Sequence, residues 1–536
     1  MKRKIVSVLL VAAMIFSLAA CGGTEDKQGE PSDTENEEGD PSVNEEGTAG
    51  GDVTFPLDEK MTYTAFSVLH ASTYDLDDSL PMQILQEECN IDIEFQSVMS
   101  AELSEKRNLL LNSGEYPELL IKSGITTSEM SDYGRQGILI PLEDLIQEYM
   151  PNLTAWLDDN DAWQWITSSD GHIYGLPCYE LAITDWTPYW INMKWIENLG
   201  LEEPTNLDEL YEVLKAFKEE DANGNGDPDD EIPLAFNGMP DFLFQYLGEA
   251  VDSRTYCYVN DGQLTFAPVS DIYHTYLEFF AKLYAEGLIL DTCFTITGEE
   301  LTAMGTANDV IGSNPAAGIF LTVGRDRDED YKILTPFEKG KYSIGNGIST
   351  GVFCVTDACE NPEPALAMFD TFYSQEGGTL ATMGVEGKTY TINEDGDWEW
   401  IVGGEYGDTV DEVRGNGTIQ GTTAGPYISP DIWWNNMSPK TDPDEVYLNK
   451  ERVRTAEYGV SVLPNMFYSQ EDEDIVSTLF TDIRTYCEEY TVQVITGEKD
   501  LESTWDEYVS TIEQMGLSEL MDAYQRTYEN SLEMLQ

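Results

Sequence analysis

From residue 63 onwards the chain alternates between short runs with the spacing of β-strands and longer runs with the spacing of amphipathic helices. Residues 63–69 and 91–98 have the apolar and alternating patterns typical of strands, and residues 82–89 between them have the pattern of a helix. Strands that alternate with helices at this spacing form βαβ units. The pattern therefore predicts an α/β fold with a mostly parallel sheet.

The alternation continues along the chain. Residues 118–121 form a short apolar run typical of a buried strand, and Pro151 divides a later helical stretch in two. Asn206 and Glu209 open the next long helix in the manner of a capping box, and residues 472–535 predict several amphipathic helices. Since single hydrophobic cores stop growing near about 250–300 residues, a chain of this length is expected to fold into two lobes.

The first 52 residues differ from the rest. Residues 2–4 are basic, residues 5–16 are apolar, and a Leu-Ala-Ala-Cys sequence ends at Cys21. The arrangement is typical of a secretory signal, and its last part resembles the lipobox of bacterial lipoproteins, in which the cysteine is acylated. We predict a signal peptide at 1–20, lipid attachment at Cys21 and an acidic, flexible tether at 21–52. The alternative is an ordinary signal peptide with an incidental cysteine.

Composition excludes some classes of partner and chemistry. The net charge of −73 argues against nucleic acid and against electrostatic adhesion to anionic lipid, because both need lysine and arginine. Of the eight cysteines, Cys21 is the predicted site of lipid attachment; the other seven, an odd number without a Cys-x-x-Cys pair, indicate reduced, buried thiols rather than a disulfide framework. With only three histidines, zinc chemistry and a histidine-based triad are disfavoured.

Residues 221–231 carry the pattern of a calcium-binding loop. Oxygen-bearing side chains stand at positions 1, 3, 5 and 9 with glycine at position 6, and calcium prefers about 6–8 oxygen ligands. The predicted ligands are the side chains of Asp221, Asn223, Asn225 and Asp229, the carbonyl of Asp227, and the closing carboxylate of Asp230 or Glu231. Position 12 is Ile232, so the usual closing glutamate is missing. We predict a structural calcium ion; the alternative is a solvated Asn-Gly turn.

Several segments together resemble one protein family. They are Cys21 after Leu-Ala-Ala, 113–120 (SGEYPELL), 137–153 (GILIPLEDLIQEYMPNL), 170–177 (DGHIYGLP), 190–217, 221–234 (DANGNGDPDDEIPL), 384–390 (GVEGKTY) and 505–517 (WDEYVSTIEQMGL). In this order they resemble the extracellular solute-binding proteins of family 1, and in particular the large lipoprotein binders of carbohydrate ABC importers, similar to alginate-oligosaccharide-binding proteins. The chain departs from its relatives at residues 192–195, where Asn-Met-Lys-Trp replaces the frequent Arg-Lys-Asp-Trp, so no arginine contact is carried over.

The resemblance implies a periplasmic-binding-protein-like fold of type II, in which two α/β lobes joined by a hinge close over a ligand in the cleft between them. We expect residues 53–178 and 306–348 in the first lobe, and residues 179–305 and 349–536, with the C-terminal helices, in the second. The resemblance also implies capture of an oligosaccharide for the permease subunits of an ABC importer. The protein would be a non-enzymatic monomer, lipid-anchored on the outer face of the cytoplasmic membrane of a Gram-positive bacterium.

Aromatic residues near the expected junction of the lobes are candidate ligand contacts, because sugar C–H faces pack on aromatic rings while hydroxyl groups need polar partners. The candidates are His70, Trp163, Asp185, Trp186, Tyr189, Phe242, Glu386, Trp433 and Trp434. For any single tryptophan the alternative is packing in the core. Because the chain is so acidic, we expect an uncharged glycan rather than an acidic one.

Two other functions fit the same features. One is a surface lipoprotein that binds a peptide or signal with the same fold. The other is a secreted glycoside hydrolase, which would need two carboxylates about 5–10 Å apart across a glycan cleft. Many acidic residues do not by themselves supply such a pair, so capture of an oligosaccharide is the favoured hypothesis.

Overall fold

The computed structural model describes residues 53–69, 75–180, 186–420, 424–438, 440, 443–461 and 463–534. All of them belong to one unit, Ala49–Gln536. The predicted signal peptide, Cys21 and the tether lie outside the described residues, as do His70 and Asp185. Among the helices that the structure describes, none combines the length and the apolar character needed to cross a membrane.

A five-stranded sheet forms the first lobe, with strand order β2-β1-β3-β11-β4. Its strands are β1 (Met61–Val68), β2 (Ile91–Val98), β3 (Leu119–Ile121), β4 (Leu176–Tyr179) and β11 (Ile348–Val355). β1 pairs in parallel with β2 and β3, whereas β11 runs antiparallel to β3 and β4. The expected parallel βαβ start of the chain is confirmed, and a strand from much later in the sequence completes the sheet.

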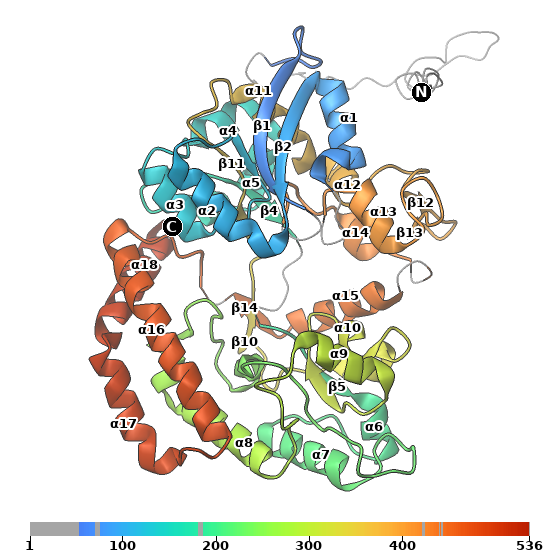
Figure 1. Cartoon of the computed structure of the whole chain (residues 1–536), viewed down its shortest axis with the longest axis vertical. Coiled ribbons are helices and arrows are strands. Elements are labelled where there is room, and N and C mark those ends of the chain that lie inside the picture. Colours follow the sequence, from blue (N-terminus) through green and yellow to red (C-terminus); the bar gives the residue numbers. More distant parts are fainter. Residues whose placement is uncertain are drawn as a thin grey trace, which may run out of the picture. The chain divides into compact units, whose positions relative to one another are not determined.

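Helices cover this sheet, and Figure 1 shows α1 and α2 on opposite sides of the β1–β2 pair. The helices of the first lobe are α1 (Leu80–Cys89), α2 (Leu103–Ser113), α3 (Thr127–Arg135), α4 (Glu143–Tyr149), α5 (Pro151–Asp159), α11 (Glu363–Asp370), α12 (Gln375–Met383), α13 (Val410–Gly417) and α14 (Asp431–Asn435); they accompany a small hairpin, β12 (Tyr390–Ile392) with β13 (Trp398–Trp400). Pro151 stands at the first position of α5, where its missing N–H costs nothing, as the sequence predicts.

The second lobe is built on a three-stranded antiparallel sheet, in the order β8-β5-β9. Its elements are β5 (Tyr189–Asn192), α6 (Met193–Asn198), α7 (Leu207–Glu219), β6 (Cys257–Asn260), β7 (Gln263–Phe266), α8 (Asp271–Ala285), α9 (Gly298–Ala307), β8 (Ser313–Pro315), α10 (Phe320–Val323), β9 (Tyr331–Ile333), β10 (Tyr342–Ile344), α15 (Pro443–Ala456) and β14 (Gly459–Ser461). The Asn206 side chain caps α7 by accepting from the Glu209 N–H at 2.9 Å. The Glu209 carboxylate accepts from the Thr205 N–H at 2.8 Å rather than from that of Asn206.

Three long helices end the chain: α16 (Gln470–Ile495), α17 (Leu501–Gln514) and α18 (Leu517–Met534), drawn in red in Figure 1. α16 and α17 pack on α8 of the second lobe, the latter with the ring of Tyr508 stacked on Tyr273, and α18 packs on α16 and β7. The first turn of α16 also contacts the first lobe, where the Ser128 hydroxyl donates to Glu473 and Arg135 donates to Gln470. The amphipathic helices predicted for the tail are therefore present, and they touch both lobes.

The strand pairing differs from the expected division of the chain. Residues 306–348 were expected in the first lobe, yet β8 and β9 within them pair with β5 of the second lobe. Residues after 349 were expected in the second lobe, yet β11 lies between β3 and β4 of the first. The difference arises because the chain passes between the lobes near residue 345, after β10 rather than before β8.

Candidate functional site

The passages of chain between the two lobes come together at one place. β4 ends at Tyr179, and the next residue, Glu180, donates its backbone N–H to the Gly347 carbonyl at 2.9 Å. Gly347 belongs to the return passage from β10 to β11. The Tyr427 hydroxyl of the first lobe donates to Glu180 Oε1 at 2.7 Å. The passage that leaves β4 and the passage that returns to β11 are thus hydrogen-bonded to each other, and the Glu180 carboxylate lies beside them at the carboxyl end of β4.

Lys122 adds a second charged group at the carboxyl end of β3, which β11 separates from β4 in the sheet. It follows β3, its side chain is 4% exposed, and its ammonium group donates to the Ile419 carbonyl. Burial lowers the pKa of Lys122 to about 8, and the nearby Glu180 carboxylate acts in the opposite direction. In α/β sheets ligands bind beyond the carboxyl ends of the strands, so Lys122 and Glu180 lie where a ligand is expected.

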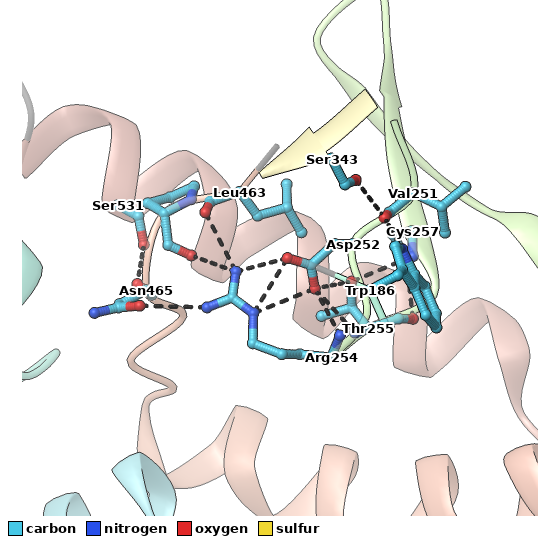
Figure 2. A network of polar contacts seen from close by, with 11 residues as sticks. Trp186, Val251, Asp252, Arg254, Thr255, Cys257, Ser343, Leu463, Asn465 and Ser531 are labelled. Carbon is cyan, nitrogen blue, oxygen red and sulfur yellow. Dashed lines mark hydrogen bonds and ion pairs between the residues drawn. The ribbon is translucent and has the colours of Figure 1, made fainter. Parts of the chain in front are cut away.

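An ion pair between a buried carboxylate and a partly exposed arginine holds another passage of chain, shown in Figure 2. Asp252 is 2% exposed and accepts from the Arg254 guanidinium at 2.6 Å. Arg254 also donates to the Leu463 and Pro464 carbonyls and to Asn465 Oδ1, on the segment that leads into α16. The Asn465 amide in turn donates to the Trp165 carbonyl of the first lobe at 2.7 Å. This network of the second lobe therefore positions a segment that contacts the first.

Three of the candidate aromatic residues pack within the second lobe. The rings of Tyr189 and Phe242 lie 4.8 Å apart in the largest hydrophobic core, and both are buried. Trp186 is 8% exposed and donates its Nε1–H to the Val251 carbonyl at 2.8 Å, beside the ion pair of Figure 2. As ligand contacts, these three residues stay predictions.

The other described candidates lie on the first lobe. Trp433 is buried and stacks on Trp398 at 5.0 Å, and the partly buried Trp434 packs edge-on against Trp433 at 6.4 Å. Trp163 packs partly on the core of the first lobe and donates to Asp158, while Glu386 is exposed. The structure thus brings Trp433 and Trp434 together, within a cluster that also holds Trp398 and Trp400, which the sequence analysis did not select.

The predicted calcium loop folds back on its own side chains. The N–H groups of Asn225, Asp227 and Asp229 donate to the side-chain oxygens of the residues two positions earlier, and the Gly226 N–H donates to Asp221 Oδ2. Two carboxylate oxygens are buried without a hydrogen-bond partner among the described residues: Asp221 Oδ1 and Glu231 Oε2. Burial also raises the pKa of Glu231.

This arrangement fits a cation. A buried carboxylate oxygen without a donor is costly, and a hard cation between Asp221 and Glu231 would satisfy both. The carboxylate of Asp230 already accepts from the amides of Asn223 and Asn225, so Glu231 is the better placed closing ligand. In the part of the chain that the structure describes, His, Cys, Asp and Glu alone form no group of three or more fit to hold a metal. A site here would need the amide and carbonyl oxygens as well.

A pair of buried carboxyl groups stands beside the start of α15. Asp328 and Asp444 are each 3% exposed, and Arg325 forms an ion pair with Asp444. Burial, with the charge of Asp444 next, raises the pKa of Asp328 to about 6. Because the folded pKa is raised, the stability contributed by protonated Asp328 is fully present below its unfolded pKa and is lost as pH rises through about 6.

We expect Asp328→Asn to unfold at higher urea than the wild type at pH 7.5, by about 2–3 kcal/mol of unfolding free energy, because the amide cannot ionise. The difference should shrink to nearly nothing at about pH 4, where Asp328 is protonated in both states. Asp326→Asn is the matched control, since that side chain is 86% exposed. Equal stabilisation by Asp328→Asn at both pH values would contradict the assignment.

Two lobes of mixed helix and sheet, joined by several passages of chain with charged side chains at the junction, define a solute-binding protein with a two-lobe, periplasmic-binding-protein-like fold. The chain belongs to the bacterial extracellular solute-binding proteins, whose family model matches residues 75–379. The family and fold predicted from the sequence are confirmed. Members of this family act outside the cytoplasm.

Three relatives illustrate the family. The chain is 28% identical to the fructooligosaccharide ABC transporter substrate-binding protein FusA of Streptococcus pneumoniae serotype 4, over 98% of this chain and 97% of FusA. It is 25% identical to the polygalacturonan/rhamnogalacturonan-binding protein YtcQ of Bacillus subtilis, over 74% of this chain and 75% of YtcQ. The structure of alginate-binding protein AlgQ2 without calcium ion matches in fold, with a TM-score of 0.66 at 22% identity over 89% of this chain and 99% of AlgQ2.

FusA has also been solved with ligands. FusA in complex with kestose matches with a TM-score of 0.72 at 26% identity, over 87% of this chain and 99% of that one. An EF-hand mutant of FusA in complex with fructo-nystose matches with a TM-score of 0.71 at 25% identity, over the same shares. These relatives are binding proteins of ABC transporters rather than enzymes.

Proposed function

We propose that this protein captures an oligosaccharide between its two lobes and delivers it to the permease subunits of an ABC importer. The observation that carries the proposal is the likeness to FusA, a fructooligosaccharide-binding protein, over 98% of this chain. Charged groups at the junction of the lobes, such as Lys122 and Glu180, support it, because a ligand held there contacts both lobes. No step of this function breaks a bond in the ligand.

Delivery of the ligand to the permease depends on closure of the two lobes about the hinge. A ligand that binds both lobes stabilises the closed arrangement by the difference between its affinities for the closed and open states. A permease that recognises the closed arrangement then receives only loaded protein. The passages at Glu180, at Gly347 and at residues 463–465 are the segments that would bend, and their hydrogen bonds would set the ease of closure.

We further propose that acylated Cys21 anchors the protein as a monomer to the outer face of the cytoplasmic membrane of a Gram-positive bacterium. Two or more acyl chains, at about 0.8 kcal/mol per buried methylene, suffice to hold a protein at a bilayer. The acidic segment at 21–52 would act as the tether. Metabolic labelling with a palmitate analogue should mark the wild type and spare a Cys21→Ser variant.

A structural calcium ion in the 221–231 loop is part of the same proposal. It is supported by the unpaired oxygens of Asp221 and Glu231 and by the existence of an EF-hand mutant of FusA. The ion would be held by the side chains of Asp221, Asn223, Asn225, Asp229 and Glu231 with the Asp227 carbonyl. When bound, it would supply positive charge that fixes the loop, and it is given no role in ligand binding.

Titration calorimetry of the purified protein against neutral oligosaccharides, acidic oligosaccharides and peptides tests the function. We expect stoichiometric binding of a sugar, and a gain of about 2.7 kcal/mol in unfolding free energy at about 100 times the dissociation constant. Chromatography of the sugar after incubation should show no products. Binding of peptides alone, or turnover of a glycan, would contradict the proposal.

A further inference from the structure

Helix α15 contacts side-chain clusters of both lobes. Val446 packs against the tryptophan cluster of the first lobe, which contains Trp433 and Trp434. Leu448, two residues later, packs in the cluster around Trp190 of the second lobe. α15 itself is joined to the second lobe by Glu451, which accepts from the Ile333 N–H at 3.2 Å. The helix therefore stands at the junction of the lobes.

One face of α15 is polar although its middle residue is buried and the other two are half-buried. Glu445, Asn449 and Arg452 are spaced i, i+4 and i+7, which places them on one side of a helix. Asn449 is only 6% exposed, and Arg452 is half-buried. A buried helix face normally carries apolar residues, so these polar residues call for partners.

Those partners are missing from the described part of the protein. Neither Oδ1 nor Nδ2 of Asn449 has a hydrogen-bond partner there. Arg452 donates through Nη2 to the Ala317 carbonyl at 3.2 Å, but its buried Nε has no acceptor. An unpaired buried polar group costs about 1–3 kcal/mol. Two such groups one helical turn apart indicate that a polar ligand supplies the missing hydrogen bonds.

The charges around Arg452 indicate whether the ligand is charged or neutral. Burial lowers the pKa of Arg452, while the carboxylates of Glu445 and Glu180 act against that shift. The Glu180 carboxylate also acts on Lys122, and its charge raises the pKa of that lysine. Each cation of this region thus already faces a carboxylate. A ligand carboxylate would meet two like charges, whereas a hydroxyl group needs only a donor or an acceptor.

We propose that Asn449 and Arg452 on α15, together with Glu180 of the first lobe, bind hydroxyl groups of the oligosaccharide and select uncharged sugars over uronates. The inference rests on the proposed function and names the class of sugar. Trp434 packs in the same cluster as Val446 and has a buried Nε1–H without an acceptor in the described residues. A tryptophan ring near amide, guanidinium and carboxylate groups is the combination that sugar recognition needs.

The test separates ligand binding from stability. Asn449→Leu keeps the volume of the side chain but removes its hydrogen-bonding groups, so we expect unchanged or higher resistance to urea and about 10- to 100-fold weaker binding of a neutral sugar. Arg452→Met should weaken binding similarly. Lys450→Met, an exposed position on the other side of α15, should leave both properties unchanged. The probes are kestose, maltotriose, cellotriose and lacto-N-tetraose, with trigalacturonate as the acidic comparison.

Each outcome decides a different point. If the wild type binds one of the neutral sugars and Asn449→Leu binds it equally well but unfolds at lower urea, Asn449 has a structural role and this inference fails alone. If the wild type binds trigalacturonate more tightly than the neutral sugars, the selectivity for uncharged sugars is wrong. If the wild type binds no sugar of either kind, the proposed function and this inference both fail.

Discussion

Replacing Arg107 by methionine should lower the free energy of unfolding by about 3 kcal/mol, because its hydrogen bonds to the Glu129 carboxylate and to the Ser123 carbonyl are lost together. The Arg107 side chain is 1% exposed and donates through Nη2 to both carboxylate oxygens of Glu129 at 2.6 Å. Through Nη1 it donates to the Ser123 carbonyl at 3.0 Å. Methionine fills a similar space but leaves the Glu129 carboxylate and the Ser123 carbonyl without these donors.

The effect of Arg107→Met should extend to the junction of the lobes. Ser123 directly follows Lys122 at the carboxyl end of β3, and Arg107 ties it to α2 and α3. Burial alone would raise the pKa of Glu129, but the hydrogen bonds from Thr126 and the charge of Arg107 outweigh it and lower the pKa. The stability contributed by ionised Glu129 is therefore present above its unfolded pKa and lost as pH falls.

Urea unfolding at pH 7.5 measures the effect of Arg107→Met. The matched control is Lys60→Met, which breaks the ion pair with Asp92; those side chains are 57% and 50% exposed. Exposed pairs contribute about 0–1 kcal/mol, so the control should unfold nearly as the wild type does. A loss for Arg107→Met no larger than that of the control would show that the buried Arg107 contributes little to stability through its contacts.

Local elements of the fold were predictable because their signals lie within a few residues. Residues 91–98 were expected as a strand and form β2 (Ile91–Val98), since alternation fixes the buried face of a strand over a short range. Pro151 begins α5 because proline fits the first turn of a helix. In the tail, Tyr508 and Ile512 are buried on one face, as their spacing indicates.

Which lobe a segment joins was not predictable in the same way. β11 lies between β3 and β4, and more than 150 residues of the second lobe separate it from β4 along the chain. Nothing in the residues 348–355 encodes this partner, because a buried strand has the same apolar pattern in either sheet. The passage near Gly347 is set by long-range pairing, so the sequence analysis placed the passage from the second lobe to the first too early in the chain, before β8 rather than after β10.

The candidate site shows a similar limit. Trp186, Tyr189 and Phe242 were selected because they are aromatic. Residue type alone does not distinguish a ring that packs in a core from a ring that contacts a sugar. Asn449 and Arg452 were missed because polar residues on a helix normally face solvent. The sequence feature that could have found them is their i, i+3 spacing beside the apolar Leu448. This spacing indicates a site only when the structure shows that α15 is buried on the face that carries them.

Removal of calcium is expected to lower the free energy of unfolding by about 4 kcal/mol, the effect of a ligand at about 1,000 times its dissociation constant. The proposed ion would satisfy Asp221 Oδ1 and Glu231 Oε2, which are buried without partners in the described residues. Without the ion, these two carboxylate oxygens lack compensation in a loop that Asp221 otherwise closes through the Gly226 N–H at 2.9 Å. Unfolding by urea in excess calcium and in chelator measures the difference.

Two variants make this test specific to the loop. Asp221→Asn retains an acceptor for the Gly226 N–H but loses the charge that attracts the cation, so its stability should depend far less on calcium than that of the wild type. Asp227→Asn is the control, because only the Asp227 carbonyl is a proposed ligand and its side chain accepts merely from the Asp229 N–H. If wild type, Asp221→Asn and Asp227→Asn all unfold identically with and without chelator, residues 221–231 form a solvated turn and the ion is not part of the protein.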